Sequence, residues 1–407
     1  MHRKFIRFGV PFLAAALALG MLTGVASATK SHSSKKTYTI AYEGPLSGGD
    51  SALGLLQNNA VQVAIAFANE GKTFGKLPFK VAYKQADDQG SGTLSPAAAQ
   101  SLITDSNVVA VVGPAFSGAT AAAEPLFSAA HMATVSPSAT RPSLVTSGWH
   151  NFFRVVADDN QQGPSDGDFI VKALKAKSVY VLNDGSAYGA GLAGVVATRA
   201  KADGASLTTD TVLGTTQCQE GTGDVSEYPP EASKIVSSKP DVVFYGGYYC
   251  GFAHMVDALR TAGYKGDVMS GDGSEDPHFV IDAGASSADG AYLSTAGATL
   301  GTTKIDKEFG TAFKAKAGFA VGEYSPESFD STNVIIDAML TLYKAGKPIT
   351  RPNIVTELHK ISYVGITKTV KFKTNGNIYG ATIFIYQVKN GKIAEIGTTK
   401  TLIASAK

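Results

Sequence analysis

The feature that most constrains the fold is an alternation of short β-rich runs with longer alanine-rich stretches. Seven runs have the composition of strands: residues 37–43, 79–84, 108–113, 132–136, 178–183, 241–246 and 267–270. Helical patterns fill most of the gaps, at residues 51–70, 94–106, 118–130, 160–175, 188–203, 251–262 and 328–345. Alternation of this kind generates parallel βαβ units. The sequence therefore predicts an α/β protein with doubly wound parallel sheets.

The size of the chain predicts more than one sheet. The chain has 407 residues, of which 44% are hydrophobic and 17% charged, and single cores stop growing near ~250 to 300 residues. No internal repeat or long low-complexity linker is visible, so we expect two α/β lobes joined by short crossovers. The formal net charge of +2 supplies no broad basic field, which argues against nucleic acid as a partner.

The first 28 residues have the pattern of a secretory signal peptide. Basic residues precede an apolar run at residues 8–22, and small residues end at Ala28, where we expect cleavage. The alternative is a transmembrane anchor, but the run is shorter than the ~20 residues of a spanning helix and contains Pro11. Residues 29–36 form a polar tether. These features predict a secreted, extracytoplasmic protein.

Export also bears on the two cysteines, Cys218 and Cys250. In an oxidising compartment they are natural partners for one disulfide. The alternative is a pair of buried free thiols. A metal site would need further ligands, and His254 alone does not supply them.

The loops after the early strands carry hydroxyl groups. Ser117 follows the strand at 108–113 and precedes a helix, where free backbone N–H groups favour an anion. Thr140 follows the next strand, so two hydroxyls on successive loops could hold one carboxylate. The alternative for each is helix capping.

The later strands end in complementary groups. Tyr248 follows the strand at 241–246, Asp272 lies in a glycine turn after 267–270, and Tyr188 lies in the loop after 178–183. Asp272 could take an ammonium group, although a turn also favours Asp. The hydroxyls in the first half of the chain suit a carboxylate, and the acid and tyrosines in the second half suit an ammonium group. Together they suggest a zwitterion held between lobes.

At these residues the chain resembles the type I periplasmic solute-binding proteins of ABC importers, specifically the leucine/isoleucine/valine-binding family. The resemblance covers roughly residues 37 to 390 and depends on ordered segments: IAYEGPLSG, VVGPAFSGAT, VSPSATRPSL, FFRVVADDNQQGP, AYGAGLA, DVVFYGGYY and VMSGDG. It implies a three-segment hinge, with crossovers near 157, 297 and 379. The N-terminal lobe would be 37–157 plus 298–378, and the C-terminal lobe 158–297 plus 379–407.

The resemblance also implies roles for individual residues. Ser117 and Thr140 would bind the ligand carboxylate, and the Ser138 carbonyl and Asp272 would accept from its ammonium group. Tyr188 would cover the ligand, and Tyr248 would line the far wall of the site. Two positions depart from the family pattern. The first loop has Leu53 where many members carry Tyr or Trp, and Asp272 stands where branched-chain binders carry Glu. Both changes shorten a side chain, and Phe116 and Tyr324 would partly refill the space.

The implied function is ligand binding by hinge closure and delivery to a membrane permease, with no cofactor, metal or catalytic residue, in a protein expected to be a monomer. The ligand would be an amino acid of the branched-chain type or a related small carboxylate. A soluble ligand sensor of the same fold is the main alternative. An exported enzyme is a weaker one: residues 189–194 match G-x-G-x-x-G, but they do not follow their strand immediately, as a dinucleotide site requires.

Overall fold

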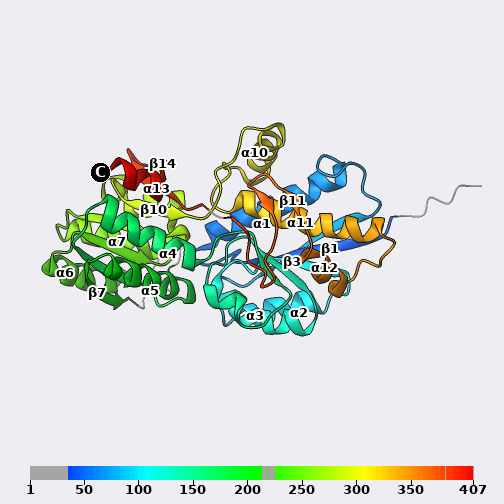
Figure 1. Ribbon diagram of the computed structural model, residues 1–407, viewed down its shortest axis with the longest axis horizontal. Helices are drawn as coiled ribbons and strands as arrows, with labels where there is room; N and C mark the ends of the chain where they lie inside the picture. The colour runs from blue at the N-terminus through cyan, green and yellow to red at the C-terminus, as the bar shows by residue number, and fades with distance from the viewer. Residues whose placement is uncertain (1–34, 213–217, 219–224, 381, 407) are drawn as a thin grey trace, which may run out of the picture. The chain divides into compact units, whose positions relative to one another are not determined.

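Two large sheets organise the chain (Figure 1). The computed structural model describes residues 35–212, 218, 225–380 and 382–406, and both sheets belong to one unit that begins at Lys36. The predicted leader, residues 1–28, lies outside the described residues, as does the tether up to residue 34. Among the helices of the described residues, none is both long enough and apolar enough to cross a membrane.

The first sheet has five parallel strands in the order β2-β1-β3-β4-β5. The strands are β1 (Thr37–Gly44), β2 (Lys80–Asp87), β3 (Val108–Val112), β4 (Ala133–Ser136) and β5 (Phe152–Arg154), and the helices between them are α1 (Ser51–Glu70), α2 (Ser95–Ile103) and α3 (Ser117–Ala129). Every residue of β3 and β4 is buried, as expected for strands covered on both faces. The strand order reverses between β1 and β3, and ligands of such sheets bind beyond the strand ends at this point.

The second sheet repeats this order in its parallel part and adds two antiparallel strands, giving β14-β13-β10-β9-β8-β6-β7. Its strands are β6 (Ser178–Asn183), β7 (Ser206–Thr211), β8 (Val242–Gly246), β9 (Asp267–Ser270), β10 (Tyr292–Thr295), β13 (Phe384–Lys389) and β14 (Lys392–Thr398). The predicted doubly wound parallel sheet is confirmed, and the antiparallel strands β13 and β14 extend it at one edge. The reversal of strand order lies between β6 and β8.

The helices of this part of the chain precede, separate and follow its strands. They are α4 (Asp159–Asp168), α5 (Ala187–Ala202), α6 (Tyr228–Ser238), α7 (Tyr249–Thr261), α8 (Pro277–Ala283), α9 (Ala285–Ala288) and the C-terminal α13 (Thr399–Ser405). Glycines allow α5 to lie close to the sheet. A Cβ at Gly189 would lie 2.3 Å from the carbonyl oxygen of Gly246 in β8.

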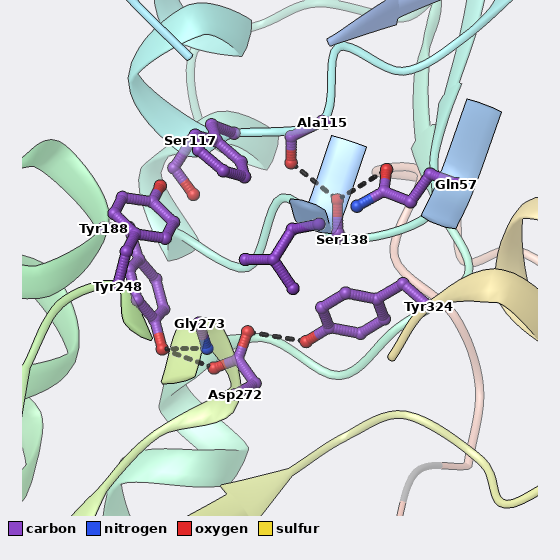
Figure 2. A pocket seen from close by; sticks show the side chains of 11 residues that line it. Gln57, Ala115, Ser117, Ser138, Tyr188, Tyr248, Asp272, Gly273 and Tyr324 are labelled. Carbon is purple, nitrogen blue, oxygen red and sulfur yellow. Dashed lines mark hydrogen bonds between the residues drawn. The ribbon is translucent and has the colours of Figure 1, made fainter. Parts of the chain in front are cut away.

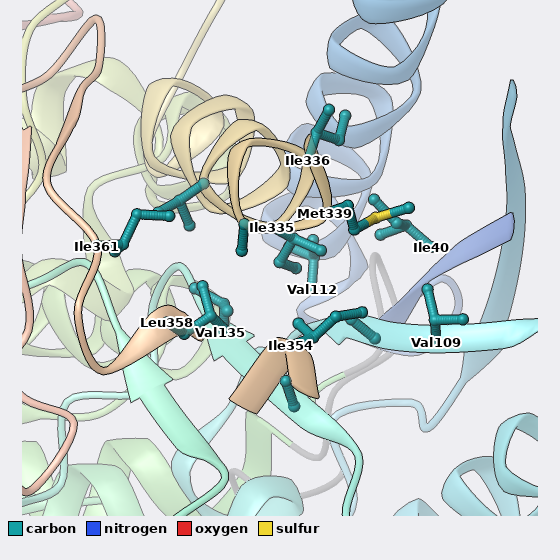
Figure 3. Close-up of a cluster of buried hydrophobic side chains, with 14 of the residues drawn as sticks. Ile40, Val109, Val112, Val135, Ile335, Ile336, Met339, Ile354, Leu358 and Ile361 are labelled. Carbon is teal, nitrogen blue, oxygen red and sulfur yellow. The ribbon is translucent and has the colours of Figure 1, made fainter. Parts of the chain in front are cut away.

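The segment after β10 returns to the first sheet. It contains α10 (Lys304–Ala317), α11 (Ser325–Lys344), α12 (Arg351–Leu358) and the short pair β11 (Tyr363–Val364) and β12 (Thr369–Val370). Helices α1 and α11 contact each other (Figure 1), and Figure 3 shows side chains of α11 and α12 against those of the first sheet, among them Ile335, Met339, Val112 and Val135. The chain thus changes sheets after β5, after β10 and before β13. The lobe boundaries near 157, 297 and 379 stay a prediction.

Candidate ligand-binding site

The carboxyl ends of the central strands carry the loops that form the site. In the first sheet these are the loops after β3 and β4, which contain Ser117 and Ser138. In the second sheet they are the loops after β6, β8 and β9, which lead to Tyr188, Tyr248 and Asp272. Because both sheets reverse their strand order beside these loops, each sheet presents its ligand-binding edge.

One cavity is lined by loops from both sheets (Figure 2). Its cavity volume is only about 10 Å³, about the room of one water molecule. It is lined by Leu53, Gln57, Ala115, Phe116, Ser117, Ser138, Tyr188, Tyr248, Asp272, Gly273 and Tyr324. The side chains that line this cavity therefore lie close together in the structure.

Of the nine residues predicted for the site, all except Thr140 line this cavity. Thr140 is fully buried. Its carbonyl oxygen accepts from the backbone N–H of Asp159, at 3.1 Å. In this structure Thr140 therefore connects the loop after β4 to the start of α4.

Asp272 is held by two tyrosines. Its Oδ1 accepts a hydrogen bond of 2.7 Å from the Tyr188 hydroxyl, and its Oδ2 accepts one of 2.6 Å from the Tyr324 hydroxyl. The Tyr188 oxygen in turn accepts from the backbone N–H of Gly273, at 2.9 Å. Each phenol has one proton to donate, so this arrangement orients both carboxyl oxygens as acceptors.

The close approach of Tyr188 depends on the glycine turn around Asp272. A Cβ on Gly273 would lie 2.7 Å from the Tyr188 ring and 3.1 Å from the carbonyl oxygen of Gly247. A side chain at position 273 would therefore displace the tyrosine that orients Asp272. The glycine after the acid is explained by this contact.

Two further acids lie in the electrostatic environment of Asp272. Burial raises the pKa of Asp272, although hydrogen bonds from Tyr324, Tyr188 and Gln162 oppose the shift. Burial, with repulsion from Asp272, raises the pKa of Asp159 to about 7. The pKa of Asp166 is also raised, mainly by burial, and its carboxyl accepts from Ser294. A cation placed beside Asp272 would stabilise the charged forms of these acids.

The opposite side of the cavity offers hydroxyls and a helix start. Ser117 is the first residue of α3, where backbone N–H groups lack partners within the helix. Its Oγ accepts from the backbone N–H of Arg141 at 3.2 Å. Ser138 donates from Oγ to the carbonyl oxygen of Ala115, at 2.7 Å. A helix N-terminus of this kind favours a negatively charged group.

Aromatic rings connect the two sheets at this site. The Phe116 ring, from the loop after β3, stacks on the Tyr248 ring with centroids 4.2 Å apart and planes at 19°. Tyr188 lies 5.1 Å from Tyr248. Leu53 and Phe116 belong to the same buried cluster as residues of the second sheet. The cavity is therefore enclosed mainly by apolar surface.

Three lining residues were not predicted: Gln57, Ala115 and Gly273. Ala115 and Gly273 are next to predicted residues in sequence, so proximity could have indicated them. Gln57 lies on α1, one turn after Leu53, and residues four apart share a helix face. That spacing is the signal that could have identified it.

The predicted disulfide between Cys218 and Cys250 is confirmed. Cys250 is the second residue of α7, two residues after Tyr248. Among the described residues, the only grouping of metal-ligand type is Cys218, Cys250 and His254. Both sulfurs are bonded to each other, so neither is a thiolate ligand there.

The G-x-G-x-x-G match at residues 189–194 lies inside α5. Gly189 packs against the backbone of Gly246, so it serves contact between helix and strand. The match therefore does not form the loop between strand and helix that holds a dinucleotide pyrophosphate.

Comparison with known proteins agrees with this geometry. Residues 37–392 match the model of a family described as periplasmic binding protein. An amino acid binding protein of Pseudomonas aeruginosa is 28% identical over 330 residues, which cover 81% of this chain and 81% of that protein. A leucine-, isoleucine-, valine-, threonine- and alanine-binding protein of the same organism is 26% identical over 353 residues, covering 86% and 90%.

Solved structures share the fold. The substrate-binding protein of a branched-chain amino acid transporter from Streptococcus pneumoniae, in complex with isoleucine, has a TM-score of 0.76 and 25% identity, covering 89% of this chain and 100% of that chain. A solute-binding protein of an ABC transporter from R. palustris, in complex with benzoate, has the same TM-score of 0.76 at 18% identity, covering 89% and 96%. A family match over most of the sequence and the shared fold show that this chain belongs to the periplasmic binding protein family and has its type I fold.

Proposed function

We propose that this protein binds an amino acid in the cavity between its two sheets and delivers it to the permease of an ABC importer. The observation that supports this most directly is the opposition of groups in Figure 2, where Asp272 lies across the cavity from Ser117 and Ser138. A carboxylate oriented by two tyrosines suits an ammonium group, and the start of α3 suits a carboxylate. The relatives that are named for amino acids support the same class of ligand.

Ligand binding would be coupled to closure of two lobes. We assign residues 37–157 and 298–378 to one lobe and residues 158–297 and 379–407 to the other. A ligand that contacts Ser117 from one lobe and Asp272 from the other stabilises the closed arrangement by its differential contacts. The closed monomer would be the form that the permease recognises.

The protein would act outside the cytoplasm, as its homologues do. The leader would be cleaved after Ala28, and the protein would have no catalytic role, in keeping with relatives that are binding proteins. The shorter side chains of Leu53 and Asp272 would give it a specificity distinct from that of the branched-chain binders.

Calorimetric titration would test the proposal. The purified protein is unfolded, freed of bound ligand, refolded and titrated with the twenty amino acids and with small aliphatic and aromatic acids that lack an amine. We expect micromolar or tighter binding of one or a few amino acids, recovered unchanged after incubation. Binding only of acids without an amine would contradict the role of Asp272, and conversion of the ligand would contradict a binding function.

A further inference from the structure

Gln57 has a side-chain donor at the cavity that no other described residue uses. The residue is fully buried and lines the cavity. Its amide oxygen Oε1 shares the single Ser138 hydroxyl proton with the Ala115 carbonyl, at 3.2 Å, and accepts from the Tyr42 hydroxyl at 3.5 Å. Among the described residues, none accepts a hydrogen bond from its amide nitrogen Nε2, which is also buried. A buried donor without an acceptor is costly, so this nitrogen is suited to a ligand atom.

The position of Gln57 places this donor away from the paired tyrosines of the second sheet. Figure 2 shows Gln57 beside Ser138 on one side of the cavity, with Tyr188 and Tyr248 on the other. Gln57 also lies one helical turn after Leu53, the position that the family resemblance assigns to the side-chain end of the ligand.

The remaining lining residues restrict the charge of a group that meets Gln57. Among the described residues that line the cavity, Asp272 is the only one with a charged side chain. A second carboxylate on the ligand would be buried without a counterion, which is strongly unfavourable. Apolar neighbours such as Leu53 and Ala115 favour a small, mostly aliphatic group.

We propose that Nε2 of Gln57 donates a hydrogen bond to a neutral oxygen in the ligand side chain, and thereby selects amino acids with a hydroxyl or amide group over aliphatic ones. This inference rests on the proposed function, because it assumes that an amino acid occupies the cavity. It makes Gln57 a specificity-determining residue that acts in addition to Ser117 and Asp272.

The test compares ligands of matched size. Threonine against valine replaces a hydroxyl by a methyl group, and glutamine against methionine replaces an amide by a thioether. In the unaltered protein we expect the oxygen-bearing ligand of at least one pair to bind more tightly. Gln57→Met should reduce that preference about tenfold, the effect of one lost hydrogen bond to a buried donor.

Gln62→Met is the matched control, because Gln62 lies on the same helix but lines a different groove, beside Tyr83. It should leave the preference unchanged. Gln57→Leu is a second variant, which also removes the donor, and it should reduce the preference in the same pair. If the unaltered protein prefers valine and methionine, or if both Gln57 variants keep its preference, the inference is wrong. Absence of binding by every amino acid would instead contradict the proposed function itself.

Discussion

Asp272 is the residue on which the zwitterion hypothesis depends. Asp272→Asn keeps the size of the side chain and removes its charge, so we expect several-fold to hundreds-fold weaker binding of an amino acid, since a charge-assisted hydrogen bond contributes roughly 1.5 to 3 kcal/mol. Calorimetric titration measures the change. Asp257→Asn is the control, because Asp257 lies on α7 in an exposed position. Equal affinity of the Asp272→Asn variant and the unaltered protein would contradict the hypothesis.

The buried acids also predict a pH dependence of binding. Burial raises the pKa of Asp272, and that of Asp159 to about 7. A bound ammonium group favours the charged carboxylates and lowers these pKa values, so binding should release protons around pH 7. Affinity should therefore fall as the pH drops through this range. Titrations in two buffers with different ionisation enthalpies measure the protons released.

The same groups act in the opposite direction on folding. A carboxyl whose pKa is higher in the folded state than in the unfolded state stabilises the fold less as the pH rises through the folded value. The protein without ligand should therefore lose stability as the pH rises from the ordinary aspartate pKa toward 7, while its affinity for an amino acid increases. An affinity that rises on acidification would contradict the assignment of Asp272 and Asp159.

The residues of the site were predictable to the extent that strand topology positions them. Ser117, Tyr248 and Asp272 follow strand ends that meet at one edge of a parallel sheet, and that rule needs no side-chain geometry. Gln57 lies within a helix whose pattern indicates only burial. Its unpaired amide nitrogen depends on contacts with Ser138 and Tyr42 from two other elements, which no local pattern contains.

At the scale of elements, apolar strands and long helices were predicted well. Helix α1 has the predicted bounds, residues 51–70. Strand β7 was missed because its sequence, SLTTDT, is mostly polar. Four of its six residues are exposed, so it lacks the apolar run that marks the other strands. The hairpin β13–β14 was missed although Asn390 and Gly391 both have positive φ, as an Asn-Gly turn between antiparallel strands requires. That dipeptide was a usable signal.

The disulfide predicts an effect on α7 and on the cavity wall. Its cysteines are 32 residues apart, and a loop of that length is worth roughly 3 to 4 kcal/mol in the chain-entropy model. Replacing both Cys218 and Cys250 by Ser should lower the free energy of unfolding by about this amount, measured by denaturant titration. Because Cys250 follows Tyr248 in the wall, ligand affinity should fall as well. Full affinity in the double variant would show that the bridge stabilises only the fold.

For the whole molecule, the contacts between elements of different sheets explain how binding could be coupled to closure. Tyr324, which precedes α11 beside the first sheet, donates to Asp272 after β9. Phe116 stacks on Tyr248. These contacts join segments that are far apart in sequence, so composition and periodicity could not predict them. Asp272 and Tyr248, which take part in these contacts, are also proposed to hold the ligand. The same residues can therefore serve both ligand binding and lobe closure.

One such contact lies outside the set of lining residues and can be altered separately. The Tyr249 hydroxyl, at the start of α7, donates to the carbonyl oxygen of Gly49 in the loop after β1, at 2.6 Å. If the lobes must separate before the ligand leaves, this hydrogen bond is broken before release. Tyr249→Phe should then raise the dissociation rate constant about two- to tenfold, the effect of one neutral hydrogen bond of ~0.5 to 1.5 kcal/mol.

The association rate constant should change less than the dissociation rate constant, because the contact forms only as the lobes meet. Stopped-flow fluorescence with a displacing ligand measures both constants. Tyr343→Phe is a matched control, since Tyr343 is exposed at the end of α11. An unchanged dissociation rate in the Tyr249→Phe variant would mean that this contact stays intact when the ligand leaves. The path of release would then not require these two segments to separate.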